Sequence, residues 1–329
     1  MSAALLVIDA HEETWPLDKP FRISRGTNTE TRVVVATVTD GQHTGRGEAV
    51  PIKRYNQSVA SVLAQIESIK GERNLDRHRI QELLPAGAAR NAMDCALWDL
   101  EAKISGKRVW ELAKIPMVPE VETSFTISLD TPPLMAAAAG ANANAPILKL
   151  KLGGDDIDLA RVEGVREAAP AARLLIDANE SWSPSHYQKI VPALKRLGVE
   201  LIEQPFPADA DEVLETLEHP IPICADESCH TSADLPGLTN RYEVVNVKLD
   251  KTGGLTEALH LCKRARESGF KLLIGCMVGT SLSMAAARLL ASTADYVDLD
   301  GPLLLARDRD HGLSYENNRI GLPSRELWG

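Results

Sequence analysis

The sequence predicts an α/β protein in which a closed (β/α) barrel follows a smaller α+β domain. From about residue 121 onward, eight short apolar runs alternate with helical stretches, and this alternation is typical of a parallel barrel. The first 118 residues show a mixed pattern of strands and helices instead. An open doubly wound sheet alternates in the same way, but eight strands close a barrel, and no GxGxxG motif follows the first run.

The expected first domain contains a hairpin and two helices. Residues 31–39 (TRVVVATVT) are rich in β-branched side chains and lead into Asp40-Gly41, which predicts a strand followed by a turn. Residues 59–69 and 88–112 carry apolar side chains at helical spacing, so we expect a helix over each of these ranges.

The expected barrel begins with the apolar runs of the second part of the chain. Its strands span residues 121–129, 147–152, 173–178, 200–204, 222–226, 244–249, 271–277 and 296–300. Helix candidates between them cover residues 156–168, 185–197, 255–268 and 281–292. Most of the strand candidates end in a polar or charged residue. Barrel enzymes carry their catalytic groups at the carboxyl ends of the strands, so these residues are the candidates for chemistry.

The composition is that of a soluble globular protein, with 44% hydrophobic and 25% charged residues. A net charge of -10 argues against nucleic acid or an anionic membrane as a partner. The five cysteines show no CxxC spacing, which predicts reduced thiols in the cytoplasm rather than a disulfide framework or a zinc site. We expect no signal peptide and no membrane-spanning segment.

Three carboxylates end consecutive strands of the expected barrel: Asp177, Glu203 and Asp226. Neighbouring parallel strands lie about 4.8 Å apart, so these acids converge on one small volume. Three anions cannot share a site without compensation, and a Mg²⁺ ion with oxygen ligands provides it. The alternative is that each acid caps a helix or is a solvated loop charge.

Three lysines flank this cluster. Lys149 and Lys151 are two residues apart in the second strand, so both face the barrel interior. Lys248 ends the sixth strand, which lies opposite the second in a ring of eight. A substrate carboxylate held by the metal therefore presents one face to Lys151 and the other to Lys248. The alternative for Lys248 alone is a solvated strand-end lysine.

This arrangement predicts the movement of a proton next to a carboxylate. Removing the α-proton creates an enediolate, which Mg²⁺ and the Lys149 ammonium can stabilise. The base needs a lowered pKa, and partial burial beside Lys149 and the metal is expected to supply it for Lys151. Two bases on opposite faces, Lys151 and Lys248, allow abstraction on one side and return on the other, which inverts the carbon.

A pair of acids ends the eighth strand. Asp298 and Asp300 share a face by the same two-residue rule and lie across the mouth from the fourth strand. They suit a cationic group at the far end of the substrate, such as an ammonium. The alternative is a strand-end turn formed by Asp300-Gly301-Pro302.

The motifs resemble those of the muconate-lactonising subgroup of the enolase superfamily over nearly the whole chain. Four segments carry the resemblance: residues 88–100 (AARNAMDCALWDL), 177–182 (DANESW), 224–230 (CADESCH) and 247–255 (VKLDKTGGL). Within the subgroup they look most like dipeptide epimerases of the L-Ala-D/L-Glu type. No histidine ends the seventh strand, unlike in the mandelate-racemase-like subgroup.

The resemblance implies a fold and an activity. It implies a modified (β/α)7β barrel at residues 119–305, covered by a capping domain of residues 1–118 that residues 306–329 join. It implies Mg²⁺-dependent interconversion of L-Ala-D-Glu and L-Ala-L-Glu in the recycling of murein peptides in the bacterial cytoplasm. The family also suggests a homo-oligomer.

The resemblance also implies substrate contacts. Arg25, in a mobile capping loop, would pair with the side-chain carboxylate of the substrate's Glu. The Asp298–Asp300 pair matches the motif that holds the substrate's α-ammonium. Thr126 and Cys276 match substrate-lining positions, or they are packing residues.

Other activities use the same scaffold. They are N-acylamino acid racemisation, o-succinylbenzoate synthesis and cycloisomerisation, whose substrates lack a free ammonium. A catalytically silent barrel is a further alternative, although intact lysines and metal acids speak against it.

Overall fold

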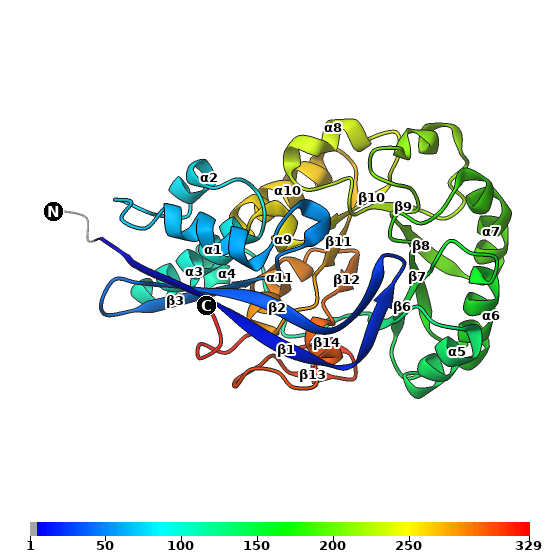
Figure 1. The fold of residues 1–329 in the computed structure, drawn as a ribbon, viewed down its shortest axis with the longest axis horizontal. Helices are drawn as coiled ribbons and strands as arrows, with labels where there is room; N and C mark the ends of the chain where they lie inside the picture. The colour runs from blue at the N-terminus through cyan, green and yellow to red at the C-terminus, as the bar shows by residue number, and fades with distance from the viewer. Residues whose placement is uncertain (1–4) are drawn as a thin grey trace.

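Eight parallel strands form the larger sheet of the computed structural model, which describes residues 5–329 (Figure 1). In the sheet they lie in chain order: β5 (Phe125–Ile127), β6 (Ile147–Lys151), β7 (Arg173–Asp177), β8 (Val199–Glu203), β9 (Ile223–Ala225), β10 (Val244–Val247), β11 (Lys271–Gly275) and β12 (Tyr296–Asp298). The first and last strands meet where the amide of Ser124 donates to the carbonyl of Val297 at 2.9 Å. The predicted barrel is confirmed, and each strand candidate overlaps one of these strands.

Helices cover the outside of the barrel between successive strands (Figure 1). They are α5 (Pro132–Ala141), α6 (Asp158–Ala168), α7 (Pro184–Arg196), α8 (Leu235–Leu238), α9 (Leu249–Thr252), α10 (Leu255–Glu267) and α11 (Ser281–Ala291). The 3₁₀ turns η2 (Asp211–Thr216) and η3 (Ser232–Asp234) precede and follow β9. The 3₁₀ turn η4 (Gly301–Leu304) follows the last strand in place of an eighth helix, which matches the (β/α)7β pattern.

The N-terminal part packs an antiparallel sheet against helices. Its strands are β1 (Val7–Ile23), β2 (Gly26–Thr39) and β3 (Thr44–Ala49), and its helical elements are η1 (Lys53–Tyr55), α1 (Val59–Ser68), α2 (Arg79–Leu83), α3 (Ala88–Ser105) and α4 (Val109–Leu112). Helix α3 lies so close to β3 that a Cβ on Gly47 would stand 2.1 Å from the carbonyl oxygen of Ala92. The single helix expected over residues 88–112 is wrong, because Gly106 turns left-handed (φ 69°) and ends α3.

Two connections hold the N-terminal part against the barrel. The hairpin β1–β2 runs across the mouth toward β6 and β7 (Figure 1), where the amide of Leu129 donates to the carbonyl of Arg22 at 3.0 Å. In the C-terminal segment, β13 (Tyr315–Glu316) pairs with β14 (Arg319–Ile320), and β14 pairs with β4 (Val121–Glu122). The same segment reaches the N-terminal part, where Arg46 in β3 donates to the carbonyl of Leu327 at 2.8 Å.

The domain boundaries 1–118, 119–305 and 306–329 stay a prediction. Residues 1–4, on which the expectation of no signal peptide partly rests, lie outside the described residues. None of the helices within residues 5–329 combines the length and apolarity needed to cross a membrane.

Candidate active site

The three strand-end carboxylates lie side by side at the barrel mouth. Asp177 and Glu203 are register partners at the ends of β7 and β8, and Asp226 directly follows β9. All three side chains are buried. The structure thus brings together the three acids that sequence analysis grouped.

The amines of the predicted lysines lie among these carboxylates. The Nζ of Lys149 is 2.6 Å from Glu203 Oε2 and 3.4 Å from Asp177 Oδ2. Lys151 Nζ lies 2.5 Å from Asp177 Oδ2, and Lys248 Nζ lies 2.6 Å from Asp226 Oδ2. Lys151 and Lys248 therefore bracket the row of acids from the β6 and the β10 side.

The acids fit a hard divalent cation by their chemistry. Their oxygens are the ligands that Mg²⁺ prefers. Burial and the charge of Asp177 raise the pKa of Glu203 to about 7, so Glu203 sits in excess negative charge that a cation would relieve. Within residues 5–329 no three acidic, histidine or cysteine side chains form a ready metal cage, because lysine amines lie between these carboxylates. The metal set stays a prediction.

The pKa of Lys248 is raised, whereas a catalytic base needs a lowered pKa. Burial alone lowers its pKa, but the charges of Asp226 and Glu203 outweigh burial and hold the pKa well above its usual value. The pKa of Lys149 is raised in the same way by Asp298, Glu203 and Asp177. Both amines are therefore ammonium groups in this arrangement.

Asp298 ends β12 and Asp300 directly precedes η4, and their side chains contact β6 and β5, respectively. Asp298 Oδ2 is 2.6 Å from Lys149 Nζ, and Asp300 Oδ2 accepts the backbone amide of Thr126 at 2.6 Å. No lysine or arginine pairs with Asp300 among the ion pairs of residues 5–329. Burial and the charge of Asp298 raise the pKa of Asp300 to about 7. A cation placed beside Asp300 would be stabilised there.

The remaining predicted residues are Cys276 and Arg25. Cys276 directly follows β11, and burial raises its thiol pKa well above the usual value, so it is a neutral lining group. Arg25 stands at the tip of the β1–β2 hairpin and reaches the mouth, where its guanidinium lies 2.8 Å from Glu227 and 3.2 Å from Glu180. The structure thus brings Arg25 from the first domain to the barrel acids.

Two residues with contacts to the predicted metal acids were given no role by the sequence reasoning. Asn246 donates its Nδ2 to Glu203 Oε1 at 2.7 Å, and Lys251 Nζ lies 2.6 Å from Asp226 Oδ1. Asn246 shares a strand face with Lys248, so the two-residue rule carries a signal for it. Lys251 returns to Asp226 because the short helix α9 turns the chain by one turn after β10, which no local pattern indicates.

Two family models match the chain. Residues 7–113 match the N-terminal domain of mandelate racemase/muconate lactonizing enzyme, and residues 134–326 match an enolase C-terminal domain-like model. Together they cover both parts of the fold.

Similar proteins of described function include an L-Ala-D/L-Glu epimerase and a racemase. The Escherichia coli (strain K12) L-Ala-D/L-Glu epimerase is 46% identical over 319 residues, which is 96% of this chain and 99% of that protein. An N-acetyl-D-glutamate racemase from Pseudoalteromonas sp. is 46% identical over 301 residues, 90% of this chain and 95% of that protein.

Solved structures show the same fold. An enolase family member from Agrobacterium tumefaciens with homology to dipeptide epimerases, solved with sodium and L-Ala-L-Glu, has a TM-score of 0.96 and 48% identity, covering 98% of this chain and 100% of that one. A dipeptide epimerase from Methylococcus capsulatus, solved with Mg and L-Arg-D-Lys, has a TM-score of 0.90 and 29% identity, covering 99% and 98%.

Proposed function

The chain belongs to the mandelate racemase/muconate lactonizing enzyme family of the enolase superfamily, and from this premise we propose that it epimerises dipeptides, with L-Ala-D-Glu and L-Ala-L-Glu as its substrate pair. The similar epimerases and racemases place it among isomerases that act on amino acid derivatives. The observation that carries the proposal is the placement of Lys151 and Lys248 at the two ends of the carboxylate row.

Asp177, Glu203 and Asp226 would hold Mg²⁺, which acts as a Lewis acid toward the substrate's carboxylate. Lys151 Nζ takes the α-proton from one face, and Lys248 Nζ delivers a proton to the other face. The reverse reaction exchanges these two roles, so each lysine is neutral when it acts as base and protonated when it acts as acid. Lys149 donates a hydrogen bond to the enediolate oxygens and stabilises their charge.

The other residues fix the dipeptide. Asp298 and Asp300 bind the α-ammonium, because Asp300 is buried and forms no ion pair with a lysine or arginine among residues 5–329. Arg25 binds the side-chain carboxylate of the C-terminal residue. Thr126 and Cys276 line the space between. From the resemblance we further infer a role in murein peptide recycling in the cytoplasm.

Solvent deuterium tests the two-base mechanism. In D₂O with Mg²⁺, the wild-type protein is expected to place deuterium at the α-carbon of the C-terminal residue of either L-Ala-Glu epimer, as read by mass. In Lys151→Ala and Lys248→Ala, epimerisation is expected to stop, while each variant still exchanges only the epimer whose α-proton faces its remaining lysine. Full epimerisation by either variant would contradict the mechanism.

Removing one charge tests the ammonium site. Asp300→Asn keeps an oxygen for the Thr126 amide but loses the charge, so KM for L-Ala-L-Glu is expected to rise about tenfold or more. Any exchange of N-acetyl-L-glutamate, which has no ammonium, is expected to change little. An equal loss with both compounds would point to misfolding of the site, and an unchanged KM for L-Ala-L-Glu would contradict the ammonium site.

A further inference from the structure

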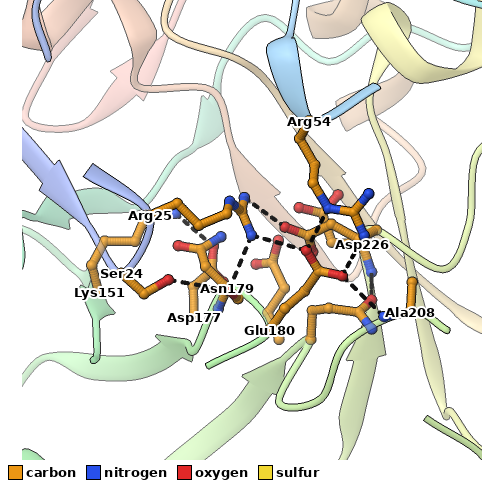
Figure 2. A network of polar contacts seen from close by, with 12 residues as sticks. Ser24, Arg25, Arg54, Lys151, Asp177, Asn179, Glu180, Ala208 and Asp226 are labelled. Atoms are coloured by element: carbon orange, nitrogen blue, oxygen red, sulfur yellow. Dashed lines mark hydrogen bonds and ion pairs between the residues drawn. The ribbon is translucent and has the colours of Figure 1, made fainter. Parts of the chain in front are cut away.

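Glu180 lies where three segments from different parts of the fold meet at the barrel mouth (Figure 2). Its carboxylate accepts both Nε and Nη2 of Arg54 at 2.8 Å and Nη1 of Arg25 at 3.2 Å. It also accepts the backbone amide of Ala208, in the loop after β8, at 2.9 Å. Arg25 lies in the β1–β2 turn and Arg54 in the 3₁₀ turn η1, two loop segments of the N-terminal part, so one side chain joins both segments to the barrel.

The backbone that carries Glu180 is held in an unusual conformation. Asn179 and Glu180 both have positive φ angles, 44° and 66°, which cost free energy in residues other than glycine. The turn begins at Asp177, whose Oδ1 accepts the amide of Asn179 at 2.9 Å. The carbonyl of Asn179 in turn accepts Ser24 Oγ at 3.1 Å and Arg25 Nη1 at 3.0 Å. The hairpin tip is therefore fastened to the strand end that carries Asp177.

We propose that Glu180 is a positioning residue that fastens both loops, residues 24–25 and 53–55, over the catalytic lysines. Its side chain is only 8% exposed and is satisfied by four donors. Buried carboxylates with several charged donors contribute far more than exposed pairs do. The Arg173–Glu200 pair in β7 and β8 shows the contrast, because it has a similar bidentate geometry but is 42% and 38% exposed.

The contacts of Glu180 with Arg25, Arg54 and Ala208, here called the latch, also determine which acid gives up Arg25 when a substrate binds. Both carboxylate oxygens of Glu227 are buried and lack a hydrogen bond within residues 5–329, although Arg25 lies 2.8 Å away. Arg25 uses Nη2 toward Glu227 and Nη1 toward Glu180, so Glu180 can keep its contact when Nη2 changes partner. A substrate carboxylate that binds Arg25 therefore replaces Glu227, while Glu180 keeps the guanidinium near the mouth. This step rests on the proposed function, whereas the closure of the loops does not.

Hydrogen exchange in the protein without substrate tests the latch directly. In Glu180→Gln, backbone amides of residues 19–27 and 52–57 are expected to exchange about tenfold faster than in the wild type, because both arginines lose their charged acceptor. Glu200→Gln is the matched control, and it is expected to leave both loops unchanged. Unchanged exchange in either loop of Glu180→Gln overturns the proposal, as does a uniform increase over the whole barrel.

Kinetics then test positioning. In Glu180→Gln, KM for L-Ala-L-Glu is expected to rise about tenfold with a smaller change in kcat, and Mg²⁺ affinity by calorimetry is expected to match that of Glu200→Gln. Arg54→Met is expected to loosen residues 52–57 more than residues 19–27. A wild-type protein that does not turn over the dipeptide contradicts the proposed function, while the exchange experiment still decides the latch. A fall in kcat with unchanged KM overturns the positioning role.

Discussion

Asn246 shows how a neutral side chain orients a charged one at the barrel mouth. It is fully buried in β10 and donates to Glu203 Oε1, while its own Oδ1 has no hydrogen-bond partner in the part of the chain that the structure describes. A Cβ on Gly275 would stand 2.5 Å from that Oδ1, so the glycine in β11 provides the space that the Asn246 side chain occupies. Asn246 therefore fixes the orientation of Glu203.

Replacing this amide tests its role in metal binding. Asn246→Leu keeps a similar volume and the same charge but removes the donor to Glu203, so we expect Mg²⁺ affinity to fall about tenfold or more. Isothermal calorimetry on the substrate-free protein measures this. Asn142→Leu at the end of α5 is the control and is expected to bind Mg²⁺ like the wild type. Unchanged affinity in Asn246→Leu would show that Glu203 needs no such support.

At the scale of single residues, the sequence predicts which residues reach the barrel mouth better than it predicts their contacts. The period-two rule and the order of strands place Lys151, Asp177 and Lys248 correctly at the barrel mouth. Glu180 could not be found in this way, because its partners Arg25 and Arg54 lie in loops far away along the chain. Such contacts depend on how the two parts of the fold dock, and no local pattern records that.

At the scale of elements, helix α10 is capped by a side chain from another helix. Asp94 in α3 accepts the amide of Thr256 at 2.9 Å and its hydroxyl at 2.6 Å, in the first turn of α10. Carboxylates at a helix N-terminus satisfy free amides and interact with the helix dipole. Burial nevertheless raises the pKa of Asp94 to about 6, because the hydrogen bonds from Thr256 offset only part of the cost of burying its charge.

This pKa predicts a pH dependence of stability. The folded-state pKa of Asp94, about 6, exceeds the unfolded value of about 3.9. The protonated Asp94 carboxyl therefore contributes fully to the free energy of unfolding below pH 4, and this contribution is lost as pH rises through 6. Asp94→Asn cannot ionise, so from pH 4 to pH 7 the wild type is expected to lose on the order of 2 kcal/mol relative to this variant. Urea unfolding of both proteins at pH 4, 5, 6 and 7 measures the difference. If the free energies of unfolding of the wild type and of Asp94→Asn change with pH in parallel, the raised pKa of Asp94 is refuted.

Elements with a clear apolar pattern are predicted well, and the others are not. Strand β1 gives no signal, because more than half of its residues are exposed or half-exposed and Pro16 interrupts its register with β2. Helix α5 has alanine on every side, so no apolar stripe marks it. The break between α3 and α4 depends on the left-handed Gly106, where a glycine inside a helical pattern is a weak signal.

For the whole molecule, the largest hydrophobic cluster spans both parts of the fold, beside a smaller cluster confined to the N-terminal part. The largest cluster of buried apolar side chains includes Val33 and Trp98 from the N-terminal part together with barrel residues such as Ile176. Trp328 belongs to this cluster, and its Nε1 donates to the carbonyl of Cys95 in α3 at 3.0 Å. The C-terminal segment thus joins the barrel to α3, and we expect the chain to unfold as one unit.

Trp328→Ala tests this cooperativity. The residue is fully buried, so its truncation leaves a cavity in the shared core and is expected to cost about 3–5 kcal/mol. Urea unfolding followed by both tryptophan fluorescence and far-UV circular dichroism should still show one coincident transition, shifted to lower urea. Trp110→Ala, which removes a partly buried ring stacked on Arg108, is expected to cost much less. If the two signals separate in Trp328→Ala, the barrel and the N-terminal part are independent folding units, and Trp328 only links them.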